Sequence, residues 1–514
     1  MKLLIILSTT LMLSNLYSQP MPRTYRLNEN MQEARPSDNS TSWILVRNRN
    51  VYLSTAKGLN VTTDGGRTFQ TKWGTDGPTD VSAGTVAVNG DTIVVAAFSP
   101  DTSIAGTDTQ VGGGLYVSTD NGASWIKEPQ SIDDTTLAKT VIFGKDTLKA
   151  LPWPTDVENA TFSLCFYHGY LYTANWAGGL RRSPDLGKTW QRMVLPPDNL
   201  DYITQDSTYN FQLSVEMSRI TTEANFNQEA FSVYSDGDSA LYVGTAGGIN
   251  KTTDDGYSWD KFSHQNQQNP ISGDWVVSLA GNNYGGNHYI WGATVNANDP
   301  NEVEALSYTT DGGASWHSIL HGHRFNAMAF QDSILYGASD DGLFRTADIG
   351  AQTQVITNVY DEQTRQSVLS QEFYAVATID DSVWLGSPDG TSMGIDNGNG
   401  FDPSSWHVFR TYVPLVSNSG STYFYPNPFS PNLDIGRIHY YIGNSGSRIT
   451  IRIFDFSMHI VKTLLQNATR PTGETDERWN GTGDHGDFVD NGIYFYSVAV
   501  NGGAPAWGKI LVVR

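Results

Sequence analysis

Cysteine, charge and long apolar runs are all scarce in this chain of 514 residues. Its single cysteine, Cys165, excludes a disulfide within the chain, so stability has to come from core size and closure of the fold. Charged residues make up only 17% of the sequence, and no basic run is present. With 53 acidic and 32 basic side chains, the net charge of -21 repels phosphate backbones and anionic lipid. Nucleic acid is therefore excluded as the expected partner.

The only strongly apolar stretch lies at the N-terminus. Lys2 precedes apolar residues 3–13, and the small residue Ser18 follows at the expected distance, which is the pattern of a secretory signal peptide. This stretch is too short to span a membrane, and no later segment approaches about 18 apolar residues. We predict that residues 1–18 are a signal peptide and that the mature chain is secreted, with no transmembrane segment.

Glycine and aromatic residues are abundant. The chain has 50 glycines, and Phe, Trp and Tyr make up 12% of it, a composition that favours turns and strands over helices. Cys165 lies within the apolar strand pattern of residues 162–166. This context predicts a packing role for Cys165, with a catalytic thiol as the alternative.

An aspartate with the same surroundings recurs seven times. A glycine lies two residues after each copy, and another lies six residues before six of them. A hydroxyl residue lies two positions before six copies, and Phe or Trp lies five positions after six copies. The seven aspartates are Asp64, Asp120, Asp185, Asp254, Asp311, Asp348 and Asp396. Such agreement indicates an internal repeat.

Short apolar strands precede each aspartate. Residues 86–88 and 93–95, for example, flank the turn at residues 89–91. Each repeat is therefore expected to form four antiparallel strands joined by tight turns. One such sheet cannot bury both of its faces, but seven packed radially bury each sheet against the next. The predicted fold class is all-β, with a seven-bladed β-propeller over residues 19–412.

The recurring aspartate has a structural interpretation. Its carboxylate can accept backbone N–H groups across a hairpin turn, the glycine supplies a positive φ, and the aromatic ring folds back beneath the turn. A catalytic or calcium-binding carboxylate is the alternative, but seven equivalent copies cannot all face one site. We therefore predict that the seven aspartates stabilise the fold.

Residues 62–69, 118–125, 183–190, 252–259 and 309–316 resemble the Asp-box, or BNR, repeat. That repeat occurs in sialidases, xyloglucanases, sortilin-type receptors and photosystem II assembly factors. The resemblance implies a β-propeller, and it implies that the boxes lie at the periphery of the blades, away from the axial site. Because those families differ in activity, the motif is no evidence for hydrolysis.

The C-terminal part of the chain has a different pattern. Residues 413–421 are polar and turn-rich, which indicates a linker. Residues 422–514 contain several short alternating strands, which favour a small immunoglobulin-like β-sandwich.

Two motif groups in this module carry a resemblance. Residues 479–481 and 491–496 are similar to the FlgD-type Ig-like domain. Residues 425–429 and 509–512 resemble the sorting domain of the type IX secretion system. This implies recognition by secretion machinery and passage across the outer membrane of a Gram-negative-type bacterium, with release or attachment at the cell surface. A plain Ig-like spacer is the alternative.

Two insertions are long for ordinary connections. Residues 126–160 and 194–230 are predicted to build a face at one end of the central channel. They contain Trp153, Tyr202 and Tyr209, whose rings are candidates for stacking on sugar rings or peptide side chains. Packing against neighbouring blades is the alternative role for these rings.

Other candidate chemistry is less specific. The histidines His317, His321 and His323 share one face of a strand, where a zinc site is conceivable, but no carboxylate or cysteine ligand accompanies them. Residues 236–238 lack EF-hand spacing and are predicted to form a hairpin turn. Residues 390–394 spell Gly-x-Ser-x-Gly, but no helix follows, as a nucleophile elbow requires. We expect neither a metal nor a cofactor.

Binding is favoured over catalysis. Glycoside hydrolysis needs two carboxylates at a defined separation, and no particular pair stands out. The Phe/Tyr-Arg-Ile-Pro motif of sialidases is absent, and the chain has room for one propeller where a xyloglucanase carries two. We expect a secreted, non-catalytic propeller that binds a protein, peptide or glycan in the envelope or outside the cell. The alternative is an extracellular glycoside hydrolase with an unidentified carboxylate pair.

Overall fold

The computed structural model describes residues 32–33, 35–72, 82–101, 109–136, 139–214, 225–297, 299–364, 366–368, 370–411, 422–431, 436–443, 446–470 and 473–514. The predicted signal peptide and linker lie outside these residues. Within them, the helical elements are two short 3-10 turns, η1 (Phe226–Gln228) and η2 (Pro403–Ser405). All other elements are strands, which confirms the all-β fold class. No helix in the described part of the chain is long and apolar enough to cross a membrane.

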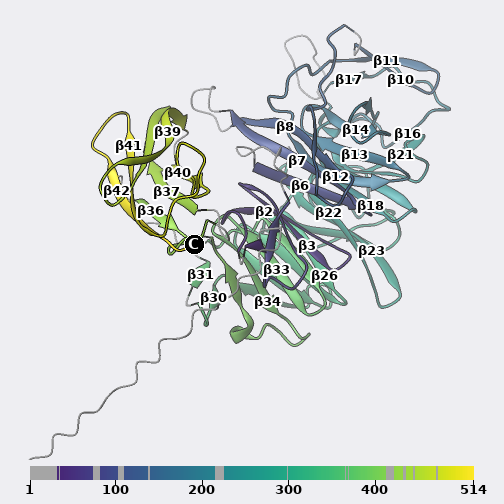
Figure 1. The fold of residues 1–514 in the computed structure, drawn as a ribbon. Coiled ribbons are helices and arrows are strands. Elements are labelled where there is room, and N and C mark those ends of the chain that lie inside the picture. Colours follow the sequence, from purple (N-terminus) through teal and green to yellow (C-terminus); the bar gives the residue numbers. More distant parts are fainter. Residues whose placement is uncertain are drawn as a thin grey trace, which may run out of the picture.

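Four-stranded antiparallel sheets follow one another along the first four-fifths of the chain (Figure 1). Sheet 1 contains β2 (Thr41–Arg47), β3 (Asn50–Thr55), β4 (Gly58–Thr62) and β5 (Phe69–Thr71), with β1 (Gln32–Glu33) added beside β5. Sheet 2 contains β6 (Ser82–Asn89), β7 (Thr92–Asp101), β8 (Thr109–Ser118) and β9 (Ile126–Glu128). Sheet 3 contains β12 (Thr161–Tyr167), β13 (Tyr170–Asn175), β14 (Gly179–Ser183) and β15 (Gln191–Arg192).

The same order of strands continues in the later sheets. Sheet 4 contains β18 (Ala230–Asp236), β19 (Ala240–Thr245), β20 (Gly248–Thr252) and β21 (Ser258–Phe262), with β16 (Tyr202–Thr204) added beside β21. Sheet 5 contains β22 (Trp275–Tyr284), β23 (Asn287–Val295), β24 (Ala305–Thr309) and β25 (His317–Ile319). Sheet 6 contains β26 (Phe325–Gln331), β27 (Ile334–Ser339), β28 (Gly342–Ala347) and β29 (Gln352–Ile356). Sheet 7 contains β32 (Ala375–Ile379), β33 (Ser382–Ser387), β34 (Gly390–Ile395) and β35 (His407–Phe409).

Two small sheets lie outside this series. One contains β10 (Thr140–Phe143), β11 (Asp146–Ala150) and β17 (Gln212–Leu213), and the other contains β30 (Val359–Asp361) and β31 (Gln366–Val368). The first comes from the two insertions, and Figure 1 shows it at the edge of the molecule.

The seven sheets form a ring through their first strands. The first strand of each sheet contacts the first strand of the next, and β2 contacts both β6 and β32, so the series closes on itself. At the closure, the hydroxyls of Thr41 and Thr391 lie 2.7 Å apart, and the Thr411 N–H donates to Asn39 Oδ1 at 2.7 Å. First strands are therefore innermost, and fourth strands lie at the periphery.

The core of the ring is divided between neighbouring sheets. Each pair of adjacent sheets encloses its own cluster of buried apolar side chains, including the pair formed by sheets 7 and 1. Trp384 of sheet 7, for example, packs with Ile44 and Leu53 of sheet 1. Both faces of every sheet are thus removed from water, which explains why no single large core is needed.

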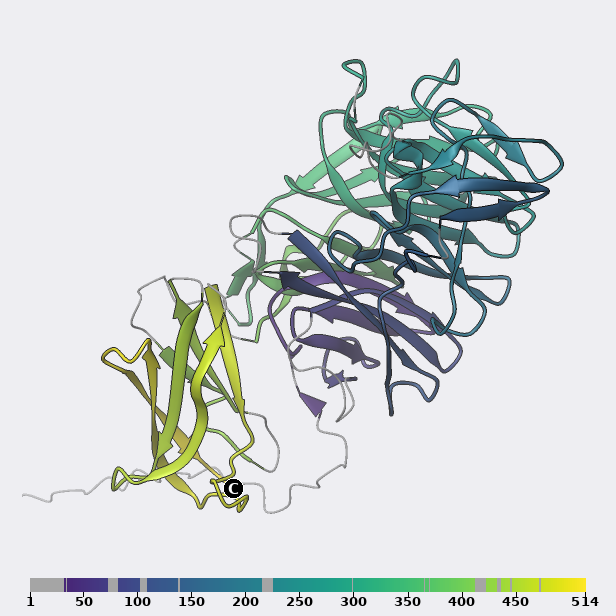
Figure 2. The same ribbon diagram turned by 90° about the horizontal axis from the view of Figure 1, so that it is seen from above.

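The C-terminal module is a sandwich of two sheets over residues 422–514. One sheet contains β36 (Thr422–Tyr425), β37 (Gly436–Ile442) and β40 (Gly473–Trp479). The other contains β39 (Ile460–Arg470), β38 (Ser447–Phe454), β41 (Gly492–Val500) and β42 (Ala506–Val512). Their inner faces share a core that includes Phe429, Ile451, Trp479 and Tyr496. Figure 2 shows this module beside the ring.

The two motifs at opposite ends of the module lie together. The Phe429 N–H donates to the Leu511 carbonyl at 2.8 Å, and the Val513 N–H donates back to Phe429 at 2.9 Å. Asn427 accepts from the Leu511 N–H at 2.8 Å and donates to the Lys509 carbonyl at 3.0 Å. The segment at residues 425–429 therefore fixes the last strand of the chain.

A buried cluster of charged groups joins the module to sheet 1. Lys57 Nζ donates to Asp476 Oδ2 at 2.9 Å, His439 Nδ1 lies 2.8 Å from Asp476 Oδ1, and Arg437 donates to the backbone carbonyl of Ser37. Arg437 and His439 are at most 2% exposed. We call this set the interface cluster; its members are Asp38, Lys57, Arg437, His439 and Asp476.

Candidate functional site

Five of the seven repeat aspartates make the same set of hydrogen bonds. In each, a buried Ser or Thr two residues earlier donates to the aspartate Oδ1 at 2.7–2.9 Å and accepts the N–H of the following glycine at 2.8–3.0 Å. The residue four positions later donates its N–H to Oδ1 and its hydroxyl to Oδ2. These are Asp64, Asp120, Asp185, Asp254 and Asp311.

These hydrogen bonds favour the charged form of each carboxylate. They lower the pKa of Asp120 to about 2, chiefly through the hydroxyl and N–H of Ser124. For Asp254, burial raises the pKa, but the hydrogen bonds from Ser258 and Thr252 outweigh it and the net shift is downward. All five carboxylates thus form their hydrogen bonds within their own turns, which connect the third and fourth strands of each sheet.

The last two repeat aspartates differ. Asp348 has a φ of 51°, and its carboxylate makes no hydrogen bond among the described residues. Asp396 is fully buried and accepts from Arg345 and from the Tyr336 hydroxyl, the latter at 2.7 Å. Burial raises the pKa of Asp396, but the hydrogen bonds from Arg345 and Tyr336 have the larger effect, so the net shift of the pKa is downward. Asp396 therefore joins sheet 7 to sheet 6.

A cation from the preceding sheet reaches three of these turns. Arg182 Nη1 donates to the Asp255 carbonyl at 2.9 Å, Lys251 Nζ to the Gly312 carbonyl at 3.0 Å, and Arg345 Nη2 to the Gly398 carbonyl at 2.9 Å. Each cation lies three residues before the aspartate of its own repeat. The aspartate turns therefore brace neighbouring sheets as well as their own hairpins.

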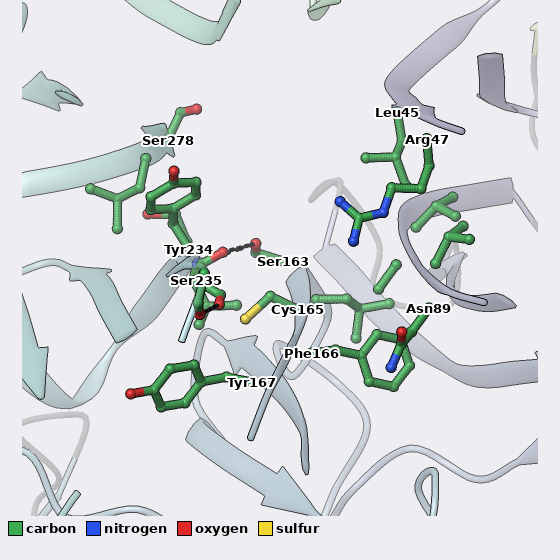
Figure 3. A pocket seen from close by; sticks show the side chains of 18 of the residues that line it. Leu45, Arg47, Asn89, Ser163, Cys165, Phe166, Tyr167, Tyr234, Ser235 and Ser278 are labelled. Atoms are coloured by element: carbon green, nitrogen blue, oxygen red, sulfur yellow. Dashed lines mark hydrogen bonds between the residues drawn. The ribbon is translucent and has the colours of Figure 1, made fainter. Parts of the chain in front are cut away.

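The axis of the ring holds a cavity of about 560 Å³. It is lined by the first strands of sheets 1 to 5, β2, β6, β12, β18 and β22, and by two of their hairpin turns. Figure 3 shows Arg47, Asn89, Tyr167 and Tyr234 around the end of the cavity where the first strands finish, with Ser163 and Cys165 between them. Leu45, Val233, Val277 and Leu279 contribute apolar surface.

A chain of aromatic rings lies toward the other end, where the first strands begin. Phe231 lines the cavity, and its ring centroid lies 5.7–6.1 Å from those of Phe162, Trp176 and Trp275. Phe98 extends the chain at 6.3 Å from Phe162. The rings are tilted or edge-on to one another, the arrangement that packed aromatics prefer. They join sheets 2 to 5 at this end of the axis.

The three predicted stacking residues lie elsewhere. Trp153 is partly buried, and its Nε1–H donates to the Val157 carbonyl at 3.0 Å. Tyr209 packs in the core between sheets 3 and 4, and its hydroxyl accepts the Thr204 N–H at 3.0 Å. Tyr202 is 49% exposed in β16, at the peripheral edge of sheet 4. None of the three lines the cavity at the axis as the described residues define it.

The structure does not bring the predicted histidines together at one site. His317 packs on the Tyr308 ring, His321 Nε2 lies 2.8 Å from Ser318 Oγ, and His323 Nδ1 lies 3.0 Å from Asp341 Oδ2. The described residues contain no group of three His, Cys, Asp or Glu side chains placed to hold a metal ion.

Two other motifs have local structural explanations. Residues 236–238 form the hairpin between β18 and β19, where Gly237 has a φ of 56°. Ser392 of the Gly-x-Ser-x-Gly sequence is fully buried in β34.

The cavity lining contains a single carboxylate, that of Asp238, among the described residues. Burial raises the pKa of the Cys165 thiol to about 12, so the reactive thiolate is negligible at neutral pH. His168 is held by Asp255, with Nδ1 2.7 Å from Oδ1. Among the described residues, the lining therefore shows no pair of carboxyl groups for glycoside hydrolysis and no activated thiol.

A buried carboxylate pair does exist outside the cavity. Asp274 and Glu302 are 8% and 6% exposed, and the Asp274 N–H donates to Glu302 Oε2 at 3.1 Å. Glu302 also accepts the N–H groups of Ala297 and Asp299, and Asp274 accepts the His264 N–H at 2.7 Å. Backbone donors occupy both side chains, so this pair fixes the loops before β22 and β24.

No protein-family model and no curated protein matches the chain. Among solved structures it is similar to YCF48 from Cyanidioschyzon merolae, with 14% identity, a TM-score of 0.42, and coverage of 72% of this chain and 99% of that one. It is similar to the GH74 enzyme of Niastella koreensis, with 12% identity, a TM-score of 0.46, and coverage of 94% and 74%. PorZ, a surface component of the type IX secretion system of Porphyromonas gingivalis, shows 13% identity, a TM-score of 0.29, and coverage of 92% and 87%.

The contacts within this chain define its class. Radially packed four-stranded sheets, closed through their innermost strands around an axial cavity, are the arrangement of a β-propeller.

Proposed function

We propose that this protein is a secreted binding propeller of seven Asp-box blades that carries an immunoglobulin-like export module. The axial cavity is its ligand site, and a protein, peptide or glycan of the envelope or the extracellular space is its partner. The Asp-box carboxylates stabilise the scaffold and take no part in binding.

The composition of the cavity lining carries this proposal. The axial cavity has the size and mixed lining of a ligand pocket, with apolar walls and a few polar groups. A glycosidase would need two carboxyl groups facing one another across the substrate, and the described part of this lining has one. Binding without turnover is therefore the function that the described lining supports best, and the glycoside hydrolase is the alternative.

Filling the cavity is expected to abolish binding without unfolding the protein. Ser278 lines the cavity, is half-buried and makes no hydrogen bond among the described residues. Replacement of Ser278 by tryptophan places a large ring in the cavity, and we expect at least tenfold weaker capture of glycans and peptides from arrays. The full chain is used throughout, and hydrolysis of the same polysaccharides is assayed in parallel.

The matched control is Ser457→Trp, which adds the same ring at an exposed turn of the C-terminal module. Binding equal in both variants places the ligand site outside the cavity. Turnover of any polysaccharide by the unmodified protein, lost in a carboxylate variant, replaces the binding proposal with the hydrolase alternative.

The export proposal rests on the C-terminal motifs and requires a fusion experiment. Deleting residues 422–514 would leave Lys57 of sheet 1 without Asp476, and Asp38, which precedes β2, without Arg437, so misfolding would mimic an export defect. Fusing residues 422–514 to a stable periplasmic reporter avoids this ambiguity. In a bacterium with a type IX secretion system, we expect the fused reporter outside the cell and the unfused reporter in the periplasm. If both reporters stay in the periplasm, the module is a spacer and not an export signal.

A further inference from the structure

Arg47 carries the only guanidinium or ammonium group of the cavity lining among the described residues. It is the last residue of β2, and its side chain is exposed. Its guanidinium makes no hydrogen bond or ion pair with any residue that the structure describes. Arg49, two residues further on, is paired with Asp380 by two hydrogen bonds. A guanidinium without an acidic partner is notable in a chain of net charge -21.

The position of Arg47 in the ring gives it access to the axis. The equivalent last residues of the seven first strands are Arg47, Asn89, Tyr167, Asp236, Tyr284, Gln331 and Ile379. Among these, Arg47 is the only cation and Asp236 the only anion. Asp236 is already engaged, with its Oδ2 2.8 Å from His288 Nε2. The free charge at this ring of positions is therefore positive.

The side chain of Arg47 is directed into the cavity. Figure 3 shows its guanidinium pointing from β2 into the space that faces Tyr234 of β18. The one carboxylate of the lining, Asp238, belongs to sheet 4, three sheets away around the ring. Arg47 thus attracts an anionic group on one side of the channel, and Asp238 repels it on the other. This difference places the anionic group of a ligand beside Arg47.

Below Arg47 the same wall becomes apolar. Leu45 and Trp43 also line the cavity, and their spacing of two residues places all three side chains on one face of β2. From Arg47 to Trp43 the strand rises about 13 Å, enough for roughly three extended residues of a ligand. Val233 of β18 and Val277 of β22, from sheets 4 and 5, add apolar surface elsewhere around the cavity. A ligand seated here meets a cation at the mouth and hydrocarbon deeper in.

On this basis, and resting on the proposed binding function, we propose that the cavity binds a free carboxylate attached to an apolar group, as at the C-terminus of a peptide ending in apolar residues. The guanidinium of Arg47 binds the carboxylate through two parallel hydrogen bonds, and Leu45, Val233 and Val277 receive the apolar side chains. Arg47 is the residue that selects a free carboxylate over a neutral end.

The test uses the full chain and a pool of N-acetylated tripeptides of Ala, Val, Leu and Phe, prepared as free acids and as C-terminal amides. We expect the acids to bind at least tenfold more tightly than the amides, by native mass spectrometry or ligand-observed NMR. Arg47→Met should remove that preference, and Arg47→Lys should retain part of it. Because Arg47 makes no internal bond, the melting temperatures should not change.

Arg49→Met is the matched control, since it removes the same charge two residues away, outside the cavity lining. Equal binding of acids and amides, an unchanged preference in Arg47→Met, or no binding of either the pool or dodecanoate overturns the carboxylate proposal. Binding of dodecanoate in place of the peptides assigns the same chemistry to a lipid source. A third outcome separates the two proposals. If the protein captures a glycan, and this capture is blocked by Ser278→Trp but unchanged by Arg47→Met, the carboxylate proposal is wrong and the proposed binding function stands.

Discussion

Replacing Asp396 by alanine is expected to destabilise the ring by about 3–5 kcal/mol, whereas the same substitution at Asp348 is expected to be nearly neutral. The two residues occupy equivalent positions in successive repeats. Asp396 is fully buried, and its removal leaves the Arg345 guanidinium, itself 8% exposed, without its counter-charge. The Tyr336 hydroxyl also loses one of its two acceptors and keeps only Gln331 Oε1, at 2.9 Å. Removing the Asp348 carboxylate leaves no buried group unpaired, because no described residue forms a hydrogen bond with it.

Asp254→Ala should fall between these two. It removes the acceptor of the buried Thr252 hydroxyl and of the Ser258 N–H and hydroxyl, within one hairpin. A loss of about 1–3 kcal/mol is expected, because these are hydrogen bonds to a charged group without a buried counter-ion. Thermal and denaturant unfolding of the three variants, each compared with the unmodified chain, gives the ranking Asp396, Asp254, Asp348. Equal losses at all three would show that the motif, and not its surroundings, sets the stabilisation.

The sequence predicted the repeating unit because its signals are local. Residues 86–88 and 93–95 lie in β6 and β7, on either side of the turn at residues 89–91, as the turn chemistry indicated. Hairpin turns, alternating apolar residues and positive-φ glycines depend on neighbours in the chain, so one sequence is enough to place them. The all-β class and the order of strands in each sheet follow from these signals.

Contacts between repeats were not predictable in the same way. The copy of Asp396 lacks the hydroxyl residue two positions earlier that Asp254 has, but this difference does not reveal its partners Arg345 and Tyr336, which belong to the preceding sheet. The insertion that carries Tyr202 packs at the periphery, because β16 pairs with β21. The length of an insertion does not indicate which side of the propeller it covers, so this placement could not be predicted from the sequence. Arg47 was accessible to sequence reasoning, because comparing the last residue of each first strand isolates it as the only cation.

The interface cluster was also missed, because its members come from segments nearly four hundred residues apart. A polar linker in the sequence gives no information on contacts between the parts it joins, whereas in the structure Asp476 is 2% exposed and pairs with Lys57 of sheet 1 and His439 of its own sheet. Such a buried pair stabilises docking only while all of its members are present, since each partner left alone carries an uncompensated charge.

Asp476→Ala should therefore release the C-terminal module from the ring. We expect a loss of about 3–5 kcal/mol in the free energy of docking, because Lys57 and His439 then lack the buried carboxylate. The measurements are the maximum dimension of the chain by small-angle X-ray scattering and the rate of proteolysis between ring and module. Asp484→Ala is the control within the same module, because its pair with Lys462 at 3.6 Å is largely exposed and contributes at most about 1 kcal/mol. Equal behaviour of the two variants would mean that the interface cluster does not hold the module.

The same cluster predicts how docking depends on pH. Burial raises the pKa of Asp476, but the hydrogen bond from His439 and the charge of Lys57 outweigh it and lower the pKa from 3.8 to about 2. A depressed folded-state pKa stabilises the docked form above the ordinary value, and this stabilisation is lost as the pH falls through the depressed one. Burial raises the pKa of Asp38, so Asp38 takes up its proton before Asp476 does, and release should follow Asp476. Scattering should thus report a docked module at pH 5 and a released one near pH 2; release complete by pH 4 would exclude Asp476 as the group responsible.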